Sequence, residues 1–173
     1  MFRYIVLALC IGLVSCEKEP ELLFQVPVRG LEFTIPAGAN PFEAQYFNFD
    51  SIPIANLVYG ASGSVDPAAV PSIRPLRAGV EAFFGNVDYD FIQEISVTLC
   101  PVGVKTPNCG REIFWRSPVP FNNGPILDLI PNENDVKEEV LEDYVNIQFK
   151  IVRLRESPNT FVESILSIDF GGR

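Results

Sequence analysis

Few side chains in this sequence could take part in catalysis, and almost all of them are carboxylates. The chain contains no histidine, which excludes histidine-dependent triads, histidine metal sites and the commonest general base near neutral pH. It also lacks the glycine motifs G-x-G-x-x-G and G-x-x-x-x-G-K that bind phosphates. Asp88, Asp90 and Glu94 could supply a carboxylate pair for glycoside hydrolysis, which we keep as an alternative. We expect a protein that is not an enzyme and needs no cofactor.

One segment has oxygen ligands at a spacing that could hold a metal ion. Asn86, Asp88 and Asp90 alternate with other residues, and such a loop can wrap around calcium. Counted from Asn86, however, the sixth residue is Phe91 and the twelfth is Val97, where an EF-hand has glycine and glutamate. We expect an ordinary loop with solvated carboxylates and keep the three residues as a candidate calcium site. No other metal site is predicted.

Cys100 and Cys109 are the pair of cysteines that could form a disulfide. They flank an eight-residue segment between two predicted strands, and in an oxidising compartment such a hairpin favours a disulfide. Closing so short a loop stabilises the fold by roughly 2–3 kcal/mol in the chain-entropy model. The spacing is not C-x-x-C, so we do not expect a redox-active pair. The alternative is two free thiols.

The spacing of apolar residues predicts an all-β fold. Polar and apolar side chains alternate with the two-residue period of half-buried strands, and Pro, Gly and Asn separate the segments. Fifteen prolines disfavour long helices. The alternating segments are 31–35, 46–49, 76–84, 95–99, 112–116, 144–155 and 162–170. We expect a single immunoglobulin-like β-sandwich of seven or eight strands, with a small β-barrel as the alternative.

One short helix is expected at residues 136–142. Asp135 would begin it, and Glu138 stands three residues later, as in a capping box. Residues 55–60 could form a further helical turn.

Within the predicted strands, parity assigns side chains to faces. The alternation changes phase after Ile151, which predicts a β-bulge near that residue. Trp115 has the same parity as Ile113, so we expect it to pack in the core. Phe83 and Phe114 have the opposite parity to the apolar stripes of their strands and are candidates for exposed contacts. The alternative is that a second layer covers them.

The N-terminal residues have the order of charge and apolarity found in a secretory signal. Arg3 precedes an apolar run of about eleven residues, which is too short to span a membrane and suits a signal peptide. Leu13-Val14-Ser15-Cys16 resembles the lipobox of bacterial lipoproteins. The resemblance implies that residues 1–15 are removed and that Cys16 is acylated, which anchors the chain stably in a membrane. The alternative is an ordinary secretory signal. We expect an acidic tether over residues 16–25 and the β-sandwich domain over residues 26–173.

The charge of the mature chain excludes nucleic acid as a partner. Removing Arg3 leaves 12 of the 13 basic residues against 22 acidic ones, a net charge of −10, and such a chain repels phosphate backbones. Residues 17–21, Glu-Lys-Glu-Pro-Glu, resemble the acidic export signal of surface-exposed lipoproteins in the Bacteroidota. That resemblance implies placement on the outer face of the outer membrane. The alternative is its periplasmic face.

Several further segments resemble a set of small Bacteroidota lipoproteins over most of the mature chain. They are 33–38, 40–42, 46–47, 84–91 and 118–122. This resemblance implies the location and the fold, and it transfers no functional residues.

We therefore expect a lipid-anchored, non-catalytic accessory subunit that docks an outer-membrane complex for uptake, secretion or assembly. The alternative is a surface glycan-binding module that uses Trp115 or a surface tyrosine as its platform. A purely structural or adhesin-like role is a further alternative.

Overall fold

The computed structural model describes residues 21–84 and 87–173, and most of the regular secondary structure there is β-strand. The predicted signal peptide, Cys16 and Asn86 lie outside these residues. The all-β class is confirmed, with eight strands. They are β1 (Phe24–Ile35), β2 (Gln45–Ile52), β3 (Ile73–Ala82), β4 (Ile92–Cys100), β5 (Arg111–Arg116), β6 (Ile126–Pro131), β7 (Val145–Leu154) and β8 (Val162–Gly172).

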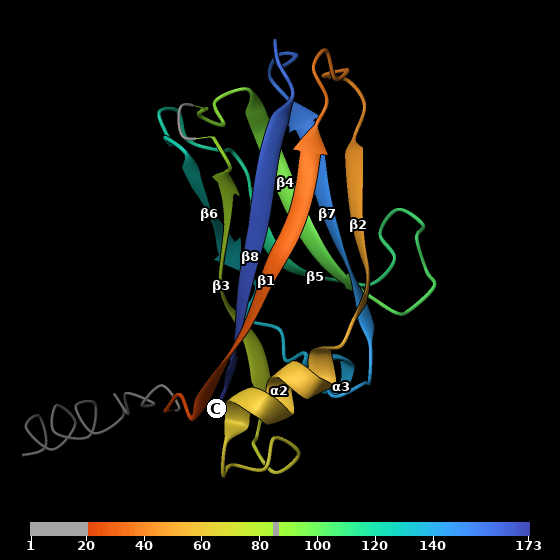
Figure 1. Ribbon diagram of the computed structural model, residues 1–173, viewed down its shortest axis with the longest axis vertical. Helices are drawn as coiled ribbons and strands as arrows, with labels where there is room; N and C mark the ends of the chain where they lie inside the picture. The colour runs from red at the N-terminus through yellow and green to blue at the C-terminus, as the bar shows by residue number, and fades with distance from the viewer. Residues whose placement is uncertain (1–20, 85–86) are drawn as a thin grey trace, which may run out of the picture.

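The strand order identifies the type of β-sandwich. The strands pair antiparallel in the order β1-β8-β3-β6-β5-β4-β7-β2. Between β6 and β5 only two residue pairs are in register, so the sheet folds there into two facing layers (Figure 1). One layer is β1-β8-β3-β6 and the other is β5-β4-β7-β2, which is the connectivity of a jelly roll. An immunoglobulin domain would instead place its first, second, fifth and fourth strands in one layer.

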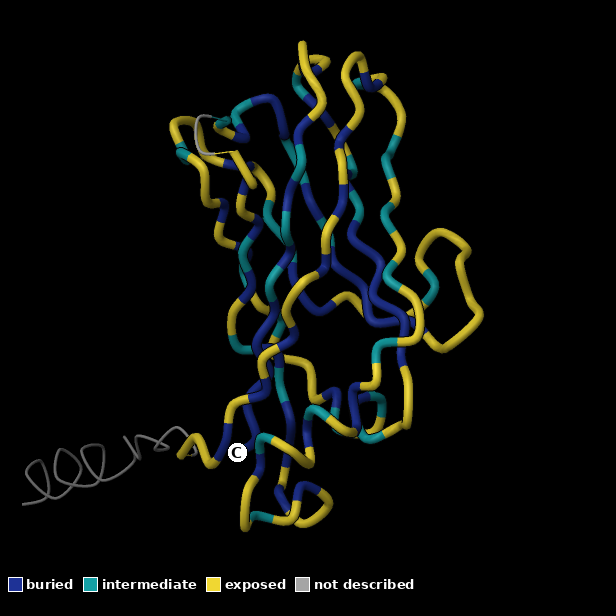
Figure 2. The backbone as a smooth tube through the Cα atoms, in the orientation of Figure 1, coloured by how far each residue is buried: buried dark blue, intermediate teal, exposed yellow. Residues whose placement is uncertain are grey.

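The core lies between the two layers and follows the predicted alternation. In β1 the buried side chains alternate with exposed ones except at Arg29 and Gly30, where the register shifts. Gly30 has φ +74°, a conformation that glycine adopts easily and that a bulge uses. Phe33 of β1 lies 4.6 Å from Phe149 and 4.8 Å from Phe47, measured between ring centroids. These rings join the two layers, and the buried residues form one continuous interior (Figure 2).

The predicted bulge in β7 is confirmed. Ile151 pairs with Ile95, and the next pair is Arg153 with Glu94, so Val152 has no partner in β4. The extra residue returns Leu154 to the core, as the change of phase in the sequence indicated.

A second bulge, in β5, overturns the predicted faces of two aromatic residues. Phe114 pairs with Val97 and Glu112 with Thr98, so Ile113 is the extra residue. Both Ile113 and Phe114 are therefore buried, and Phe114 is 0% exposed. The prediction that Phe114 is an exposed contact is wrong. Trp115 is turned to the outer face and is partly exposed, so the prediction that it packs in the core is wrong too.

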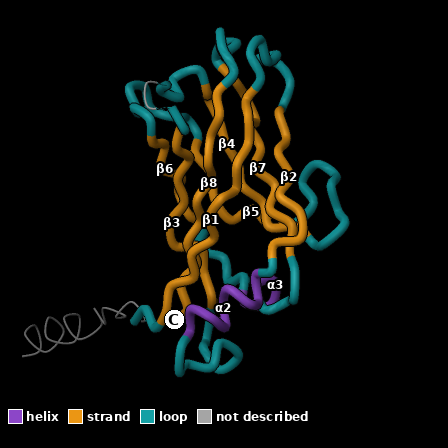
Figure 3. The backbone as a smooth tube through the Cα atoms, viewed as in Figure 1, coloured by secondary structure: helices purple, strands orange, loops and turns teal. Residues whose placement is uncertain are grey.

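Two short helices close one end of the sandwich (Figure 3). α2 (Ile54–Ser62) buries Ile54, Ala55 and Val58 and is longer than the expected turn. α3 (Lys137–Val140) is shorter than the expected helix, although Asp135 Oδ1 accepts the backbone N–H of Lys137 at 3.1 Å. In the described part of the chain, no helix has both the length and the apolarity needed to cross a membrane. β1 begins at Phe24, two residues before the expected start of the domain.

Candidate functional site

Four loops meet at the end of the sandwich that lies away from the helices. They are residues 36–44, 83–91, 117–125 and 155–161, which follow β1, β3, β5 and β7. In a jelly roll of antiparallel strands, these four connections fall at the same end. Figure 1 shows them at the top of the molecule, whereas the start of β1, the C-terminus and α2 lie at the bottom.

The four loops carry exposed phenylalanine side chains. Among residues 21–84 and 87–173, every phenylalanine classed as exposed lies in these loops, with exposures between 47% and 90%. The five residues are Phe42, Phe83, Phe84, Phe121 and Phe161. We call them the phenylalanine cluster. Exposed large apolar side chains that gather at one place mark an interaction surface. Phe83, a candidate from the sequence, belongs to this cluster.

Hydrogen bonds connect the loops to one another. The guanidinium of Arg155 donates to the carbonyl oxygens of Asp90 at 2.7 Å and Ile92 at 2.6 Å, and also to that of Val119. It lies over the ring of Phe121, 4.2 Å from the centroid. One side chain thus joins three of the loops or their adjoining strand ends.

A backbone hydrogen bond attaches the remaining loop, residues 36–44, to the loop of residues 155–161. The N–H of Gly38 donates to the carbonyl oxygen of Pro158 at 2.8 Å. Within residues 36–44, Asn40 Oδ1 accepts the N–H of Phe42 at 3.0 Å, which fixes the turn that carries the Phe42 ring. The phenylalanine cluster therefore stands on a preorganised base, which lowers the entropy cost of binding.

The end that carries the phenylalanine cluster is also acidic. The described residues of the four loops contain four carboxylates, Glu43, Asp88, Asp90 and Glu156, and one cation, Arg155. Beside Phe83, a shallow pocket of about 250 Å³ contains Glu32 and Glu163 as well. Exposed apolar rings together with an excess of carboxylates favour a partner that is apolar and basic.

The carboxylates of the candidate calcium loop are engaged in local structure. Asp90 Oδ1 accepts the N–H of Asn122 at 2.7 Å, and Asp88 Oδ1 accepts the N–H of Asp90 at 3.4 Å. In the described ranges, no three His, Cys, Asp or Glu residues are grouped as metal ligands. Asn86 lies outside the described residues, so the calcium site stays a prediction.

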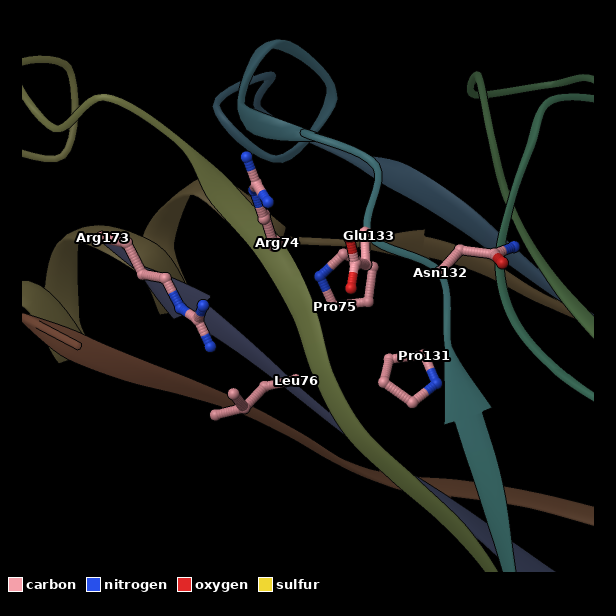
Figure 4. A pocket seen from close by; sticks show the side chains of 7 residues that line it. All are labelled: Arg74, Pro75, Leu76, Pro131, Asn132, Glu133 and Arg173. Atoms are coloured by element: carbon pink, nitrogen blue, oxygen red, sulfur yellow. The ribbon is translucent and has the colours of Figure 1, made fainter. Parts of the chain in front are cut away.

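At the other end of the sandwich, a pocket beside the disulfide contains two carboxylates, Glu139 and Glu142, whereas a second pocket at this end contains one. The second pocket, of about 310 Å³, is lined by Arg74, Pro75, Leu76, Pro131, Asn132, Glu133 and Arg173 (Figure 4). Glu133 is the one acidic side chain among these lining residues, so this pocket offers no pair of carboxyl groups of the kind that glycoside hydrolysis needs.

The interior contains one titratable group that could be mistaken for a catalytic one. The hydroxyl of Tyr89 is buried and lies 3.0 Å from Ser164 Oγ. Burial, which disfavours the charged phenolate, raises the pKa of Tyr89 to about 12, and the hydrogen bond between Tyr89 and Ser164 opposes this rise. The phenol stays protonated at neutral pH and has a structural role.

The predicted disulfide is confirmed. Cys100 and Cys109 are bonded, with their Cα atoms 5.3 Å apart. The loop between them reaches across to β2, where Lys105 Nζ lies 2.5 Å from Asp50 Oδ2. Gly110 follows the second cysteine, and a Cβ at that position would lie 2.0 Å from the carbonyl oxygen of Leu99. The hairpin therefore requires glycine there.

The chain is similar to solved structures that include chains of two viruses. No family model and no curated protein sequence matches the chain. A chain of the Kashmir bee virus empty particle at acidic pH is 16% identical, with 88% of this chain and 93% of that chain covered and a TM-score of 0.34. A chain of Cocksfoot mottle virus is 8% identical, with 94% and 89% covered and a TM-score of 0.28.

Proposed function

We propose that this protein is a lipid-anchored, non-catalytic accessory subunit of an outer-membrane complex, and that the phenylalanine cluster docks its partner. The observation that carries the proposal is the gathering of the exposed phenylalanines on four connected loops at one end of the sandwich. Burying three such rings would contribute about 5–9 kcal/mol toward offsetting the cost of association.

The anchor belongs to the opposite end of the molecule. The lipobox resemblance assigns the acyl chains to Cys16, and β1 begins a few residues later at the end where the helices lie. A lipid attached there directs the phenylalanine cluster away from the anchor. The partner is then a protein that extends from the membrane, with an apolar surface flanked by basic residues.

Co-purification from detergent-solubilised outer membranes tests this proposal. The tagged full-length chain should recover a membrane protein in stoichiometric amount. A Phe42→Ser/Phe121→Ser variant should recover at least about tenfold less, because it loses two anchors of the interface. Tyr59→Ser is the matched control, since Tyr59 is exposed on α2 at the other end. Recovery of the protein alone, or equal recovery by all three forms, would contradict the docking role.

The proposed location has its own test. A Cys16→Ser variant should lose labelling by a fatty-acid probe and leave the membrane fraction. Protease added to intact cells should cleave the wild-type chain if it faces outward. A chain that is protected in intact cells and cleaved after lysis would place it on the periplasmic face instead.

A further inference from the structure

The outer face of the layer β5-β4-β7-β2 carries a straight row of four side chains. Tyr46 pairs with Lys150, Lys150 with Ser96, and Ser96 with Trp115. Residues opposite one another in a sheet project to the same face, and the sequence neighbours Val97, Phe149 and Phe114 on the other face are buried. Tyr46 and Trp115 therefore stand at the two ends of one row, three strand spacings or about 14 Å apart.

The outward direction of this row follows from the bulge in β5. Val97 and Phe149, the sequence neighbours of Ser96 and Lys150, are 0% exposed. Phe114, the neighbour of Trp115, is buried against them as the partner of Val97. If Glu112 kept its pairing with Thr98 and no residue were extra, Trp115 would oppose the buried Ile95 and point into the core.

Hydrogen bonds fix the polar groups between the two aromatic rings. Ser96 Oγ donates to Glu112 Oε2 at 2.5 Å, and Asn132 Nδ2 donates to Glu112 Oε1 at 3.2 Å. Lys150 Nζ lies 5.4 Å from the centroid of the Tyr46 ring. One cation and one anion thus stand between the rings, so the row has no strong net charge.

The disulfide-closed loop bounds the row on one side. Its Lys105 reaches Asp50 on β2, and since β7 lies between β4 and β2, the loop passes over β7. Lys150 Nζ also donates to Asn108 Oδ1 of this loop at 3.5 Å. In the next row, Gln148 is only 1% exposed. The accessible surface is therefore a strip rather than an open sheet face.

We infer that this strip is a binding site for a neutral oligosaccharide chain. The apolar C–H face of a pyranose ring stacks on aromatic rings, and its hydroxyl groups need both donors and acceptors placed at the side. The strip offers two aromatic rings at its ends and the side chains of Ser96, Lys150 and Glu112 between them. The paired charges do not favour phosphate or nucleic acid. The strip is also narrower than the surface of a stable protein interface.

Tryptophan fluorescence tests this inference directly, because Trp115 is the only tryptophan in the chain. The full-length protein in mild detergent is titrated with short neutral oligosaccharides of glucose, mannose, xylose and galactose. At least one series should shift the Trp115 emission and saturate. It should also protect Trp115 from quenching by acrylamide.

Variants separate the strip from other sites. Tyr46→Ala retains the Trp115 reporter and should weaken binding about tenfold, the loss expected for one stacked ring. Tyr144→Ala is the control, an exposed tyrosine outside the row. Binding by Tyr46→Ala as tight as by wild type would overturn the inference, as would an emission that no series changes. The Phe42→Ser/Phe121→Ser variant should bind saccharide normally, because the inference does not rest on the docking role.

Discussion

Arg155 is the residue on which the order of the phenylalanine-bearing loops depends most. Its guanidinium donates to three backbone carbonyl oxygens on two other chain segments and lies over Phe121. Hydrogen bonds from a charged donor contribute about 1.5–3 kcal/mol each, and the cation–π contact about 0.5–1 kcal/mol. Arg155 is partly exposed, so water can replace some of these bonds. We expect Arg155→Ala to lower the free energy of unfolding by about 3–5 kcal/mol.

Arg155→Lys distinguishes geometry from charge. Lysine retains the positive charge, but its ammonium is a single point and cannot reach three carbonyls as the planar guanidinium does. We expect Arg155→Lys to retain less than half of the free energy of unfolding that Arg155→Ala loses. Urea denaturation of the three proteins measures the free energies, and hydrogen exchange should show faster exchange in residues 87–92 and 117–125 of both variants.

Two outcomes would refute this reasoning. One is an Arg155→Ala variant within about 0.5 kcal/mol of wild type, the range of an ordinary surface substitution. The other is an Arg155→Lys variant that is as stable as wild type and retains the protection of both loops.

Three other substitutions test the packing of the sandwich. Gly110→Ala places a Cβ 2.0 Å from a backbone oxygen and should cost about 2–3 kcal/mol. In the same urea titration Gly60→Ala, with nothing within 4 Å of the added Cβ, should gain about 0.5–1 kcal/mol, because Gly60 lies within α2. Asp169 is 2% exposed and paired with Arg29 and Arg77. Asp169→Asn should lower the free energy of unfolding by about 1–3 kcal/mol, a limited loss because both arginines can turn to water. Wild-type stability should fall as pH rises from 10 to about 12, since the pKa of Tyr89 is raised in the folded state. Tyr89→Phe should lack this part of the decline, and equal slopes for the two proteins in thermal melts at these pH values would contradict the assignment.

The sequence predicted seven of the eight strands, because alternation is a property of each strand alone, and it missed β6. Ile151, Val152 and Leu154 break the alternation visibly, so the bulge in β7 could be predicted. In β5 the residues Ile113 and Phe114 are followed by Trp115, so three apolar side chains in succession satisfy either phase. Only the pairing with β4 decides which of them faces out, and that pairing is a long-range property.

The phenylalanine cluster could not be predicted for a similar reason. Phe42 and Phe121 stand beside turn-forming residues, in Pro41-Phe42 and Pro120-Phe121-Asn122. Such a position indicates exposure but does not indicate where in the fold the ring lies. Which loops share one end of the sandwich depends on the strand order. Alternation does not encode that order, so the loops come together only in the folded chain.

Site-specific photo-crosslinking in intact cells tests the central claim most directly. A photoreactive residue is placed at Phe42 or Phe121, and in a separate strain at Tyr59 on the opposite end. We expect both loop positions to crosslink one and the same membrane protein, and the Tyr59 position to give no such product. Crosslinking at Tyr59 and not at the loops, or no protein product from either loop position, would contradict docking through the phenylalanine cluster.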